Sequence, residues 1–502
     1  MLLTEKYADK ISGTITCYDR IIIQGVIPSW SYPEGLTGYF YGHDLKIFEY
    51  AKFCEPLTKA VRANAEKIAK EEGVEIEFIR NIKAFRKDDR IQEIIKERGV
   101  TEGLVHIFSA METCNSYRPW HDKGSGRTFF KYDTSKCVHY YFYFIDRDLG
   151  LCYMRVPTWC PFRLQFYVNG HNLLAGKMRK KNIEYEMLDN AFIYISDFEM
   201  AQKLSDRFNP EELHKILDVF AKRYCPIAAE LEMSYAWTTM QVECATDIVF
   251  KKQEYLQPMY DEIIKMAIYT VRPDNIATFL GQRITYNCKK EAGNNFNQRI
   301  LGTRIKHHMG DVSIKMYDKF GLVLRIESTC NNVGAFRVNR EVQHNDGSVT
   351  VEKAPMKKTI YSLYQLFTIM KAANYRYLEF ISTFDDHSDG EKNLSDTTMP
   401  AQENGRSYRG FNFFNPEDLR ILEVIDRGEF NIHGLQNREV RSHLTGVSSS
   451  AMSRVLNRLR LHGLIEKVKG SHRYFLTSLG KAVIVAGLKV KNLIIIPELA
   501  LA

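Results

Sequence analysis

The chain has 502 residues, which is long for a single ordinary domain and predicts two to four domains. A hydrophobic content of 45% allows large cores, and a net charge of +8 favours a polyanionic partner only mildly. The N-terminus has no apolar signal core, and no run of eighteen apolar residues occurs. The ten cysteines show no zinc-knuckle or thioredoxin-like spacing, so we expect a reduced, soluble, cytoplasmic protein outside the membrane.

Several common catalytic fingerprints are absent from the sequence. It contains no Gly-x-x-x-x-Gly-Lys-[Ser/Thr] loop and no Gly-x-Gly-x-x-Gly motif, which argues against an ATP motor and a dinucleotide enzyme. It also contains no Gly-x-Ser-x-Gly elbow of the kind that carries a hydrolase serine.

Residues 1–135 have the pattern of an N-terminal α/β region. Strand-like and helical segments alternate there, which indicates an α/β or α+β unit. The expected elements are a long strand or strand pair at 11–27, a helix at 45–73, a strand at 74–79, a helix at 88–99 and a strand at 104–108. A polar, glycine-bearing insertion is expected at 117–136.

Residues 136–385 form the expected β-rich and helical body, the candidate catalytic core. A hairpin is predicted at 138–156, because Asp146 and Gly150 lie in a turn-forming stretch between two apolar runs. The further expected elements are a strand at 162–168, a helix at 173–181, helices over 197–270, a strand pair at 312–316 and 322–328, and a helix at 358–385. Residues 386–406, rich in Asp, Ser, Asn and Gly, are predicted to be a linker. The fold class expected for the whole chain is α+β.

Residues 407–502 contain the clearest pattern in the chain. Asn415 and Pro416 supply an N-cap and a first-turn proline for one helix, a second short helix follows, and the run of serines ending at Ser450 begins a third. Two short β-like runs then flank a basic turn. This segment resembles the MarR-like winged-helix DNA readers, which implies insertion of the third helix into a major groove. The residues expected at nucleic acid are Ser449, Arg454, Arg458 and Arg460, which would face outward, and Lys467, Lys469 and Arg473 of the wing.

A stretch between residues 302 and 327 suggests chemistry. A Gly-Thr-Arg turn ending at Arg304 precedes a Tyr-x-Lys element, Tyr317 to Lys319, and an Arg-x-Glu element, Arg325 to Glu327, follows. This order resembles rolling-circle replication initiators, in which a tyrosine attacks a DNA phosphate and becomes joined to the 5′ end. The resemblance implies that Tyr317 is the nucleophile, with Lys319 on the same strand face and Glu327 as base or ligand. An ordinary strand tyrosine and a cross-strand ion pair are the alternative.

The same family holds a divalent cation with histidine and acidic or amide side chains. The nearest counterpart is His171 with Asn169, at the end of an apolar strand, although the family often has two histidines there. The resemblance therefore implies Mg²⁺ or Mn²⁺ bound by His171, Asn169 and Glu327. Arg304, Lys306 and His307 are expected to form a basic loop that contacts phosphates.

Two other patterns leave alternatives open. The hairpin that carries Asp146 resembles the opening of the RNase H-like fold, and with Glu243 or Asp247 on a helix it would form a three-carboxylate metal site. Asp is also common in hairpin turns for conformational reasons. Aromatic and basic residues around Trp120 and Lys131 suit a nucleic-acid backbone with a stacked base, and they suit an exposed loop equally well.

These patterns lead to one expected function and two alternatives. The first is a nucleic-acid-processing protein of a mobile element or plasmid, active in replication initiation, which binds DNA through the winged helix. It would nick and rejoin a strand as a metal-dependent endonuclease. The alternatives are a non-catalytic DNA- or RNA-binding protein and the three-carboxylate nuclease. DNA is the expected partner, RNA is possible, and a homodimer would suit a winged helix.

Overall fold

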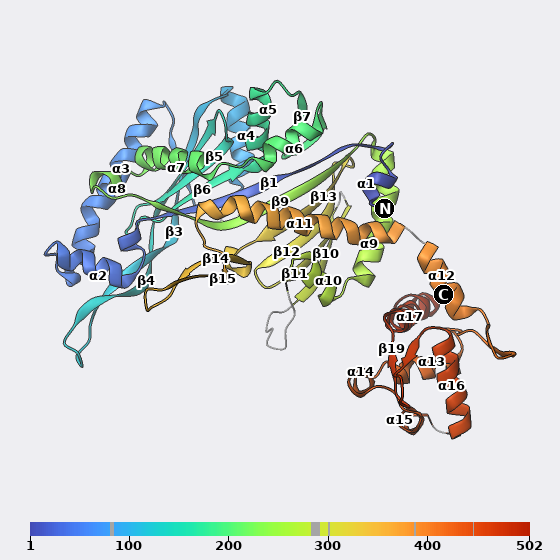
Figure 1. Cartoon of the computed structure of the whole chain (residues 1–502). Helices are drawn as coiled ribbons and strands as arrows, with labels where there is room; N and C mark the ends of the chain where they lie inside the picture. Colours follow the sequence, from blue (N-terminus) through green and yellow to red (C-terminus); the bar gives the residue numbers. More distant parts are fainter. Residues whose placement is uncertain (81–84, 283–291, 300–301, 386–387, 445, 502) are drawn as a thin grey trace. The chain divides into compact units, whose positions relative to one another are not determined.

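The computed structural model describes residues 1–80, 85–282, 292–299, 302–385, 388–444 and 446–501. The chain divides into two compact units, Met1–Ser382 and Thr383–Ala502, each with its own core (Figure 1). Helices and strands are both abundant, and a large mixed sheet dominates the first unit, so the α+β class is confirmed. Among the described residues, no helix is long and apolar enough to cross a membrane.

The first unit is built on a single eleven-stranded sheet with the order β10-β11-β12-β13-β9-β1-β6-β5-β4-β3-β2. Neighbouring strands are antiparallel except β2 and β3, which are parallel. The strands are β1 (Ile11–Val26), β2 (Ile76–Ile79), β3 (Gly103–His121), β4 (Thr128–Asp146), β5 (Gly150–Pro157), β6 (Leu164–Asn169), β9 (Ala236–Phe250), β10 (Ala292–Arg299), β11 (Gly302–Met309), β12 (Val312–Lys319) and β13 (Val323–Cys330). Two separate hairpins are β7 (Tyr185–Leu188) with β8 (Ala191–Ile195) and β14 (Arg337–Gln343) with β15 (Val349–Pro355).

Helices pack on both faces of this sheet. The long helix α11 (Leu363–Ser382) crosses strands β9 and β13, and Figure 1 shows it running along the sheet. On the other face, a small core that includes Ile15 and Cys17 of β1 packs against α5 (Gly170–Lys180) and α6 (Phe198–Asp206). The remaining helices are α1 (Leu3–Lys6), α2 (Pro33–Gly42), α3 (Tyr50–Glu71), α4 (Lys87–Arg98), α7 (Pro210–Tyr224), α8 (Ile227–Glu230), α9 (Gln253–Thr270) and α10 (Pro273–Phe279).

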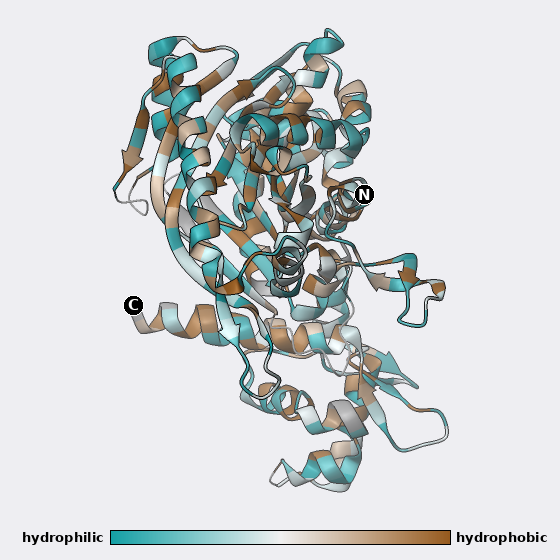
Figure 2. Cartoon of the chain, turned by 90° about the vertical axis from the view of Figure 1, so that its left-hand side faces the viewer, coloured by the Kyte–Doolittle hydropathy of each residue, from teal (hydrophilic) through white to brown (hydrophobic). Residues whose placement is uncertain are grey.

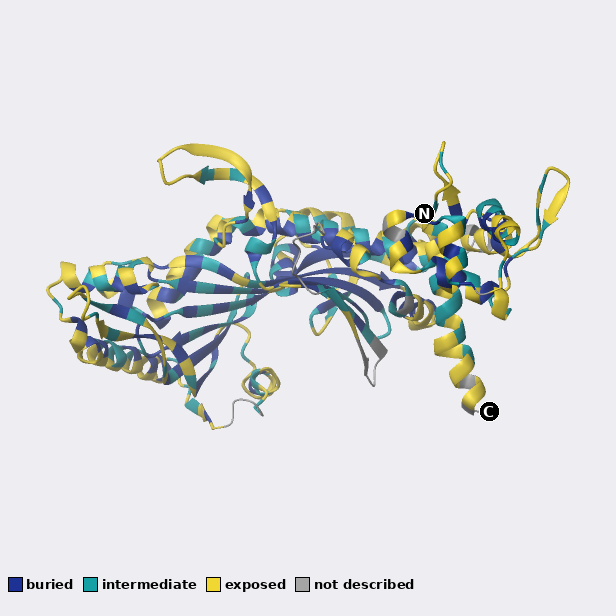
Figure 3. Cartoon of the chain, turned by 90° about the horizontal axis from the view of Figure 1, so that it is seen from below, coloured by how far each residue is buried: buried dark blue, intermediate teal, exposed yellow. Residues whose placement is uncertain are grey.

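Hydropathy and burial follow the strand pattern. Figure 2 shows hydrophobic and hydrophilic residues interspersed along the strands, as the alternation of side chains between two faces requires. In Figure 3 the strands of the sheet are largely buried, while exposed residues concentrate on helices and hairpins. β13 is the extreme case, because all eight of its residues are buried, including Arg325 and Glu327. Charged side chains therefore lie inside the sheet layer, where they require partners.

The prediction that residues 197–270 are helical throughout is wrong for their central part, which forms strand β9 between β13 and β1. The stretch is rich in β-branched residues such as Thr239, Val242 and Ile248, which favour strands. Glu243 and Asp247 break its apolar pattern, and at a spacing of four they also suit one helix face. They lie on a strand instead, so the predicted helical setting of a three-carboxylate site does not exist.

The segment predicted to be a polar insertion at 117–136 is a β-hairpin. β3 and β4 pair along their whole length, from Gly103 opposite Ile145 to His121 opposite Thr128. Polar and aromatic residues alternate along both strands, and at the tip of a hairpin such residues need no core. The pair also crosses the domain boundary predicted at 135/136, since β4 begins before it and ends after it.

The second unit contains the helices and the hairpin expected of a winged helix. Asn415 caps α13 by accepting hydrogen bonds from the N–H groups of Glu417 and Asp418, and Ser448 caps α16 through the N–H of Ala451. The predicted linker 386–406 contains a helix and most of a small hairpin, and its residues 386–387 lie outside the described residues. The elements are α12 (Ser388–Thr398), β16 (Ala401–Glu403), β17 (Arg406–Tyr408), α13 (Pro416–Ile425), α14 (Gly428–His433), α15 (Asn437–Ser442), α16 (Ser449–Leu461), β18 (Ile465–Lys467), β19 (Tyr474–Leu476), α17 (Ser478–Lys489), η6 (Val490–Ile495) and α18 (Ile496–Leu501).

Candidate functional site

Charged and polar side chains from four adjacent strands meet on one face of the sheet. Glu327 of β13 lies opposite Lys315 of β12, and Arg325 lies opposite both Tyr317 of β12 and Asp247 of β9. Cross-strand partners point to the same face, and so do residues two apart on one strand. The register therefore places these side chains together, away from the face that α11 covers.

A bulge in β1 adds Asp19 to this group. Tyr18 pairs with Cys244 and Arg20 pairs with Glu243, so Asp19 has no opposite residue in β9. An extra residue of this kind bends the strand and redirects a side chain, which is why bulges recur near functional sites. Its carboxylate joins those of Glu243 and Glu327, and one oxygen from each lies within 4.8 Å of the others.

These three carboxylates, hereafter the carboxylate triad, can hold a metal ion. Asp19 and Glu243 are 7% and 8% exposed, and Glu327 is fully buried. Three buried carboxylates repel one another, and oxygen ligands of this type suit hard divalent cations. Lys315 Nζ lies 2.5 Å from Glu327 Oε1, so a metal ion would share this oxygen with the ammonium or displace it. The proximity of three carboxylates is the feature that fits a cation.

The triad carboxyl groups differ in their ease of ionisation. Burial raises the pKa of Glu327 to about 7, although the ammonium of Lys315 opposes this shift. Burial also disfavours the charged form of Asp19, but the hydrogen bond with His171 and the charge of Arg325 outweigh it and lower the pKa of Asp19. Near neutral pH, Glu327 can thus exchange a proton, whereas Asp19 stays ionised.

A second group of buried charged side chains, namely Arg325, Asp247 and His171, contacts the triad through Asp19. The Arg325 guanidinium is fully buried and binds Asp247 through Nε and Nη2, each at 2.6 Å from a carboxylate oxygen. Its Nη1 lies 3.2 Å from Asp19 Oδ1. His171 lies between the two carboxylates, with Nδ1 3.0 Å from Asp19 and Nε2 3.2 Å from Asp247. Burial opposes its charged form, but Cys17 and both carboxylates raise the pKa of His171, which favours the imidazolium.

The turn between β7 and β8 lies against this network. Asn190 donates through its side-chain amide to Asp19 Oδ1 at 2.7 Å, and its backbone carbonyl accepts from Arg325 at 2.6 Å. Lys319 Nζ reaches Asp189 at 3.2 Å, and Asp189 adopts a left-handed backbone with φ 52°. Three polar contacts thus hold the turn at the side of the triad.

Tyr317 is directly coupled to the triad. Its hydroxyl donates a hydrogen bond of 2.7 Å to Glu327 Oε2. Burial, followed by the charge of Glu327, raises the pKa of Tyr317 well above the usual range of a phenol. The phenol is thus kept neutral, and the nearest proton acceptor is the carboxyl group whose pKa is about 7.

The residues predicted to bind the metal are only partly brought together. Glu327 belongs to the triad, but Asn169 caps α5 by accepting the N–H of Asn172. His171 is engaged by Asp19, Asp247 and Arg325. A side chain at a helix N-terminus is drawn to orphan N–H groups, and the sequence comparison with the histidine motif did not account for this demand. Asp19 and Glu243 occupy the positions beside Glu327 instead.

The predicted basic loop around His307 is a strand, β11, whose two faces differ. His307 is fully buried on the face that α11 covers. Its Nδ1 contacts Asn294 Oδ1 at 2.7 Å, and its Nε2 contacts the Tyr377 hydroxyl of α11 at 3.0 Å. Burial lowers the pKa of His307 to about 4, so it is neutral and the prediction that it contacts phosphate is wrong. Lys306 pairs with Lys315, which places it and Arg304 on the face of the triad.

Asp146, the carboxylate of the RNase H-like alternative, has a local role. Its Oδ1 accepts the backbone N–H groups of Asp148 and Leu149 at 2.8 and 2.9 Å. It therefore stabilises the β4–β5 turn, as aspartates commonly do at such positions.

In the hairpin tip of β3 and β4, Lys131 Nζ lies 3.9 Å from the ring centroid of Trp120, which is 40% exposed.

In the second unit, the prediction that Arg458 faces outward is wrong. It is 7% exposed, and its Nη1 and Nη2 donate to the two oxygens of buried Asp418 at 2.7 and 2.9 Å. The guanidinium also lies 3.9 Å from the ring centroid of Phe411. Arg460 donates to Glu403 at 2.5 Å, and Arg473 donates to the carbonyl of His433. The exposed members of the predicted surface are Ser449, Arg454, Lys467, Lys469 and Arg473.

Replacing Arg458 or Arg454 by alanine is expected to give opposite results. Arg458→Ala leaves buried Asp418 with only the more distant Arg409, at 3.3 Å, and should destabilise the unit by about 3–5 kcal/mol. Arg454→Ala should change stability by less than about 0.5 kcal/mol. If the second unit binds DNA, as its resemblance to winged-helix readers implies, this change should also weaken DNA binding and reduce its salt dependence by about one phosphate contact. Hydrogen exchange of residues 416–461 and DNA titrations at several salt concentrations measure the two effects. Equal losses of DNA affinity without destabilisation would contradict this assignment.

Sequence reasoning missed Asp19 and Lys315, and it misplaced Glu243. A signal for Asp19 is present, because Asp19 and Arg20 directly precede the apolar run Ile21 to Ile23. Charges in a strand that is otherwise apolar need partners in the layer. The partners of Asp19 lie at least 150 residues away in the sequence, as in the case of His171, and only the tertiary structure identifies them.

Comparisons with known proteins give no further guide. No protein-family model, no curated protein and no solved structure matches this chain.

Proposed function

We propose that the first unit is a metal-dependent nucleic-acid strand transferase in which Tyr317 is the nucleophile and the carboxylate triad holds Mg²⁺ or Mn²⁺. The observation that carries this proposal is the hydrogen bond of 2.7 Å between the Tyr317 hydroxyl and Glu327, one member of the triad. It places a nucleophile, a proton acceptor and a cation site within one layer of side chains. The setting would be replication initiation in a plasmid or mobile element, as in the rolling-circle initiators that this region resembles.

The chemical step balances with the residues present. The Tyr317 oxygen forms a bond to a backbone phosphorus while its proton passes to Glu327, and the bond from phosphorus to the 3′ oxygen breaks. The product is a phosphotyrosine at the 5′ end and a free 3′ hydroxyl, which takes a proton from solvent. A divalent cation at the triad would neutralise charge on the phosphoryl oxygens. Reversal of the same step rejoins the strand.

The surroundings of Tyr317 support a polyanionic substrate. Lys315 Nζ lies 5.8 Å from the ring centroid of Tyr317, and Lys319 is two residues further along the strand. On the same face, Arg20 lies 5.9 Å from the ring of Tyr167, which stacks on Tyr153 with centroids 5.2 Å apart and an interplanar angle of 8°. Cations interleaved with aromatic rings suit a nucleic-acid backbone and its bases.

Cation binding to the triad is expected to depend on pH. The pKa of Glu327, about 7, lies above its ordinary value of 4.5 because the side chain is buried. Below pH 7 a cation must displace this proton, so the apparent affinity should fall by about tenfold per pH unit and level off above pH 7. Without a cation, the free energy of unfolding should fall as pH rises from 4.5 through 7, because ionising the buried Glu327 carboxyl group costs folding free energy. Manganese titrations followed by electron paramagnetic resonance at pH 5.5–8.5 check this; an affinity independent of pH would contradict it.

The cation site itself is tested with a pair of variants. Glu243→Gln removes one triad charge and should weaken Mn²⁺ binding by about tenfold or more, which is ~1.4 kcal/mol. Asp146→Asn is the matched control, since it neutralises the carboxylate of the alternative site and should leave binding unchanged. If Asp146→Asn weakened binding, the three-carboxylate alternative that uses Asp146 would replace this proposal.

A non-catalytic nucleic-acid-binding protein is the second candidate, and one observation favours it. Each triad carboxylate already has a cationic neighbour, namely Arg325 for Asp19, Lys315 for Glu327, and Arg20 at 3.8 Å for Glu243. A cluster that is internally compensated can serve the fold alone. In that case Mn²⁺ would not bind, and DNA binding would reside in the second unit.

A further inference from the structure

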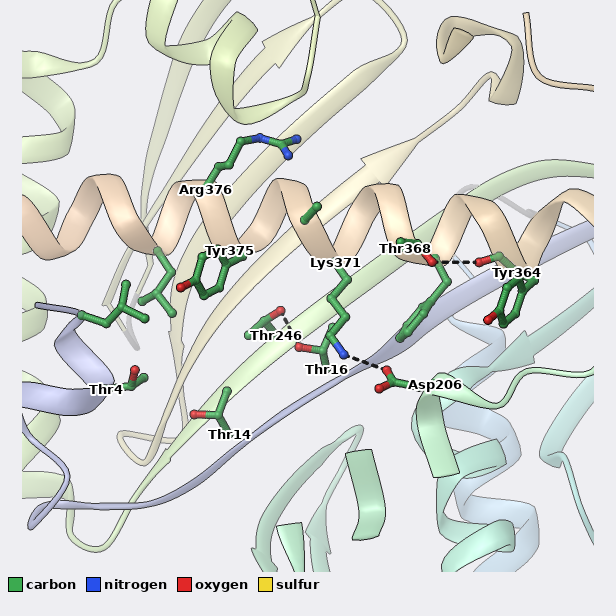
Figure 4. A pocket seen from close by; sticks show the side chains of 14 residues that line it. Thr4, Thr14, Thr16, Asp206, Thr246, Tyr364, Thr368, Lys371, Tyr375 and Arg376 are labelled. Atoms are coloured by element: carbon green, nitrogen blue, oxygen red, sulfur yellow. Dashed lines mark hydrogen bonds and ion pairs between the residues drawn. The ribbon is translucent and has the colours of Figure 1, made fainter. Parts of the chain in front are cut away.

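A second pocket lies on the opposite face of strands β1 and β9, beneath one flank of α11 (Figure 4). Its volume of about 710 Å³ is in the range of small-molecule sites. Thr14 and Thr16 of β1 and Thr246 of β9 form its strand side. Phe367 and Leu378 supply apolar lining from α11. The pocket is thus separated from the carboxylate triad by the thickness of the sheet.

The hydroxyl groups of Thr16 and Thr246 have two hydrogens, and the hydrogen bond between them uses only one. Asn374 Nδ2 donates to Thr246 Oγ1 at 3.2 Å, and the Thr246 and Thr16 hydroxyl oxygens are 2.9 Å apart. Each hydroxyl has one hydrogen, and only one of the two is used between them. Within the described part of the chain, no acceptor is recorded for the other hydrogen, although both threonines are only 5% exposed. A buried donor of this kind calls for an acceptor in the pocket.

Both signs of charge occur at the pocket wall, where Lys371 and Arg376 are cationic and Asp206 is anionic. The Arg376 guanidinium is engaged by the backbone carbonyls of Thr278 and Phe279. Lys371 Nζ lies 2.7 Å from Asp206 Oδ1, and the same oxygen accepts from Gln202 at 2.8 Å. The pair is only partly buried, with side-chain exposures of 37% for Lys371 and 43% for Asp206. Figure 4 shows Lys371 extending from α11 towards Asp206. The second Asp206 oxygen and the other N–H groups of Lys371 can therefore serve a ligand.

We infer that this pocket binds a zwitterion, a free α-amino acid with a bulky apolar side chain. Its carboxylate would accept from Lys371 and from the threonine hydroxyl, and its ammonium would bind Asp206. Its side chain would contact Phe367, Leu378 and the ring of Tyr375. A ligand with both charges leaves the Lys371–Asp206 pair balanced, whereas a ligand with one charge would unbalance it. This inference does not depend on the function proposed for the triad.

Isothermal titration of the full chain with L-phenylalanine tests the inference. One saturable site per chain is expected, and 3-phenylpropionate and phenethylamine, which each carry one charge, should bind at least about tenfold more weakly. Asp206→Asn and Lys371→Met should each weaken L-phenylalanine to a similar degree. No saturable binding, or equal binding of the single-charge compounds, would overturn the inference.

Two further variants separate loss of the site from loss of the fold. Thr368→Trp places a large ring at an exposed position that lines the pocket, so it should abolish binding while the circular dichroism spectrum stays unchanged. Gln365→Ala lies exposed on the same helix, does not line the pocket and should bind as the natural chain does. Undiminished binding by a folded Thr368→Trp variant would place the amino acid elsewhere.

Discussion

Tyr317→Phe is expected to reduce formation of a covalent protein–DNA adduct by at least about 1,000-fold, because loss of a nucleophile leaves only binding and electrostatic effects. The change removes one hydroxyl and its hydrogen bond to Glu327, and it keeps the ring in β12. DNA affinity should therefore stay within about twofold of the natural chain. Adducts are measured on denaturing gels and affinity by fluorescence anisotropy.

A matched control is available in the same sheet. Tyr132 lies in β4, is 61% exposed and has no role in the triad. Tyr132→Phe should form the adduct at the natural rate. If Tyr317→Phe kept adduct formation while Tyr132→Phe or another tyrosine variant lost it, the nucleophile would be misassigned.

Arg325→Met is expected to destabilise the first unit by about 3–5 kcal/mol, the cost of removing the guanidinium from a buried carboxylate that then keeps only His171 at 3.2 Å. Asp247 is fully buried and loses both of its bonds of 2.6 Å, and Asp19 loses a neighbour at 3.2 Å. Urea unfolding followed by tryptophan fluorescence measures this unit alone, since all four tryptophans (Trp30, Trp120, Trp159 and Trp237) lie within it.

Two further variants test whether the loss of stability comes from the buried charged network. Arg20→Met removes an arginine whose side chain is 46% exposed and whose contact with Glu243 is 3.8 Å, so it should cost less than about 1 kcal/mol. The double variant Arg325→Met with Asp247→Leu should recover part of the lost stability, because no charge is then left unpaired at that position. Equal destabilisation by Arg325→Met and Arg20→Met would contradict the network described here.

Local signals predicted where two helices of the second unit begin. Asn415 with Pro416 and the serines that end at Ser450 mark helix starts by satisfying backbone N–H groups, and both helices begin there. The outward direction of Arg458 could not be predicted in the same way. Its partner Asp418 lies forty residues earlier, and an arginine on a short helix reads as exposed until a buried carboxylate is known.

The triad could be predicted only in part. Tyr317 and Glu327 are ten residues apart on paired strands, so a local motif joins them. Asp19 and Glu243 reach them through strand order, with β9 between β1 and β13 and a bulge that redirects Asp19. Neither periodicity nor residue type encodes that order, and Glu243 with Asp247 at a spacing of four favoured a helix.

Strand transfer by Tyr317 and the carboxylate triad, as proposed above, requires a divalent cation. The most direct measurement incubates the full chain with labelled single-stranded and duplex DNA libraries, in Mg²⁺, in Mn²⁺ and in chelator, followed by denaturing gels with and without protease. We expect a slowly migrating, protease-sensitive species that appears only with the cation. Binding of DNA with neither cleavage nor adduct under any of these conditions would rule out strand transfer and leave a nucleic-acid-binding protein.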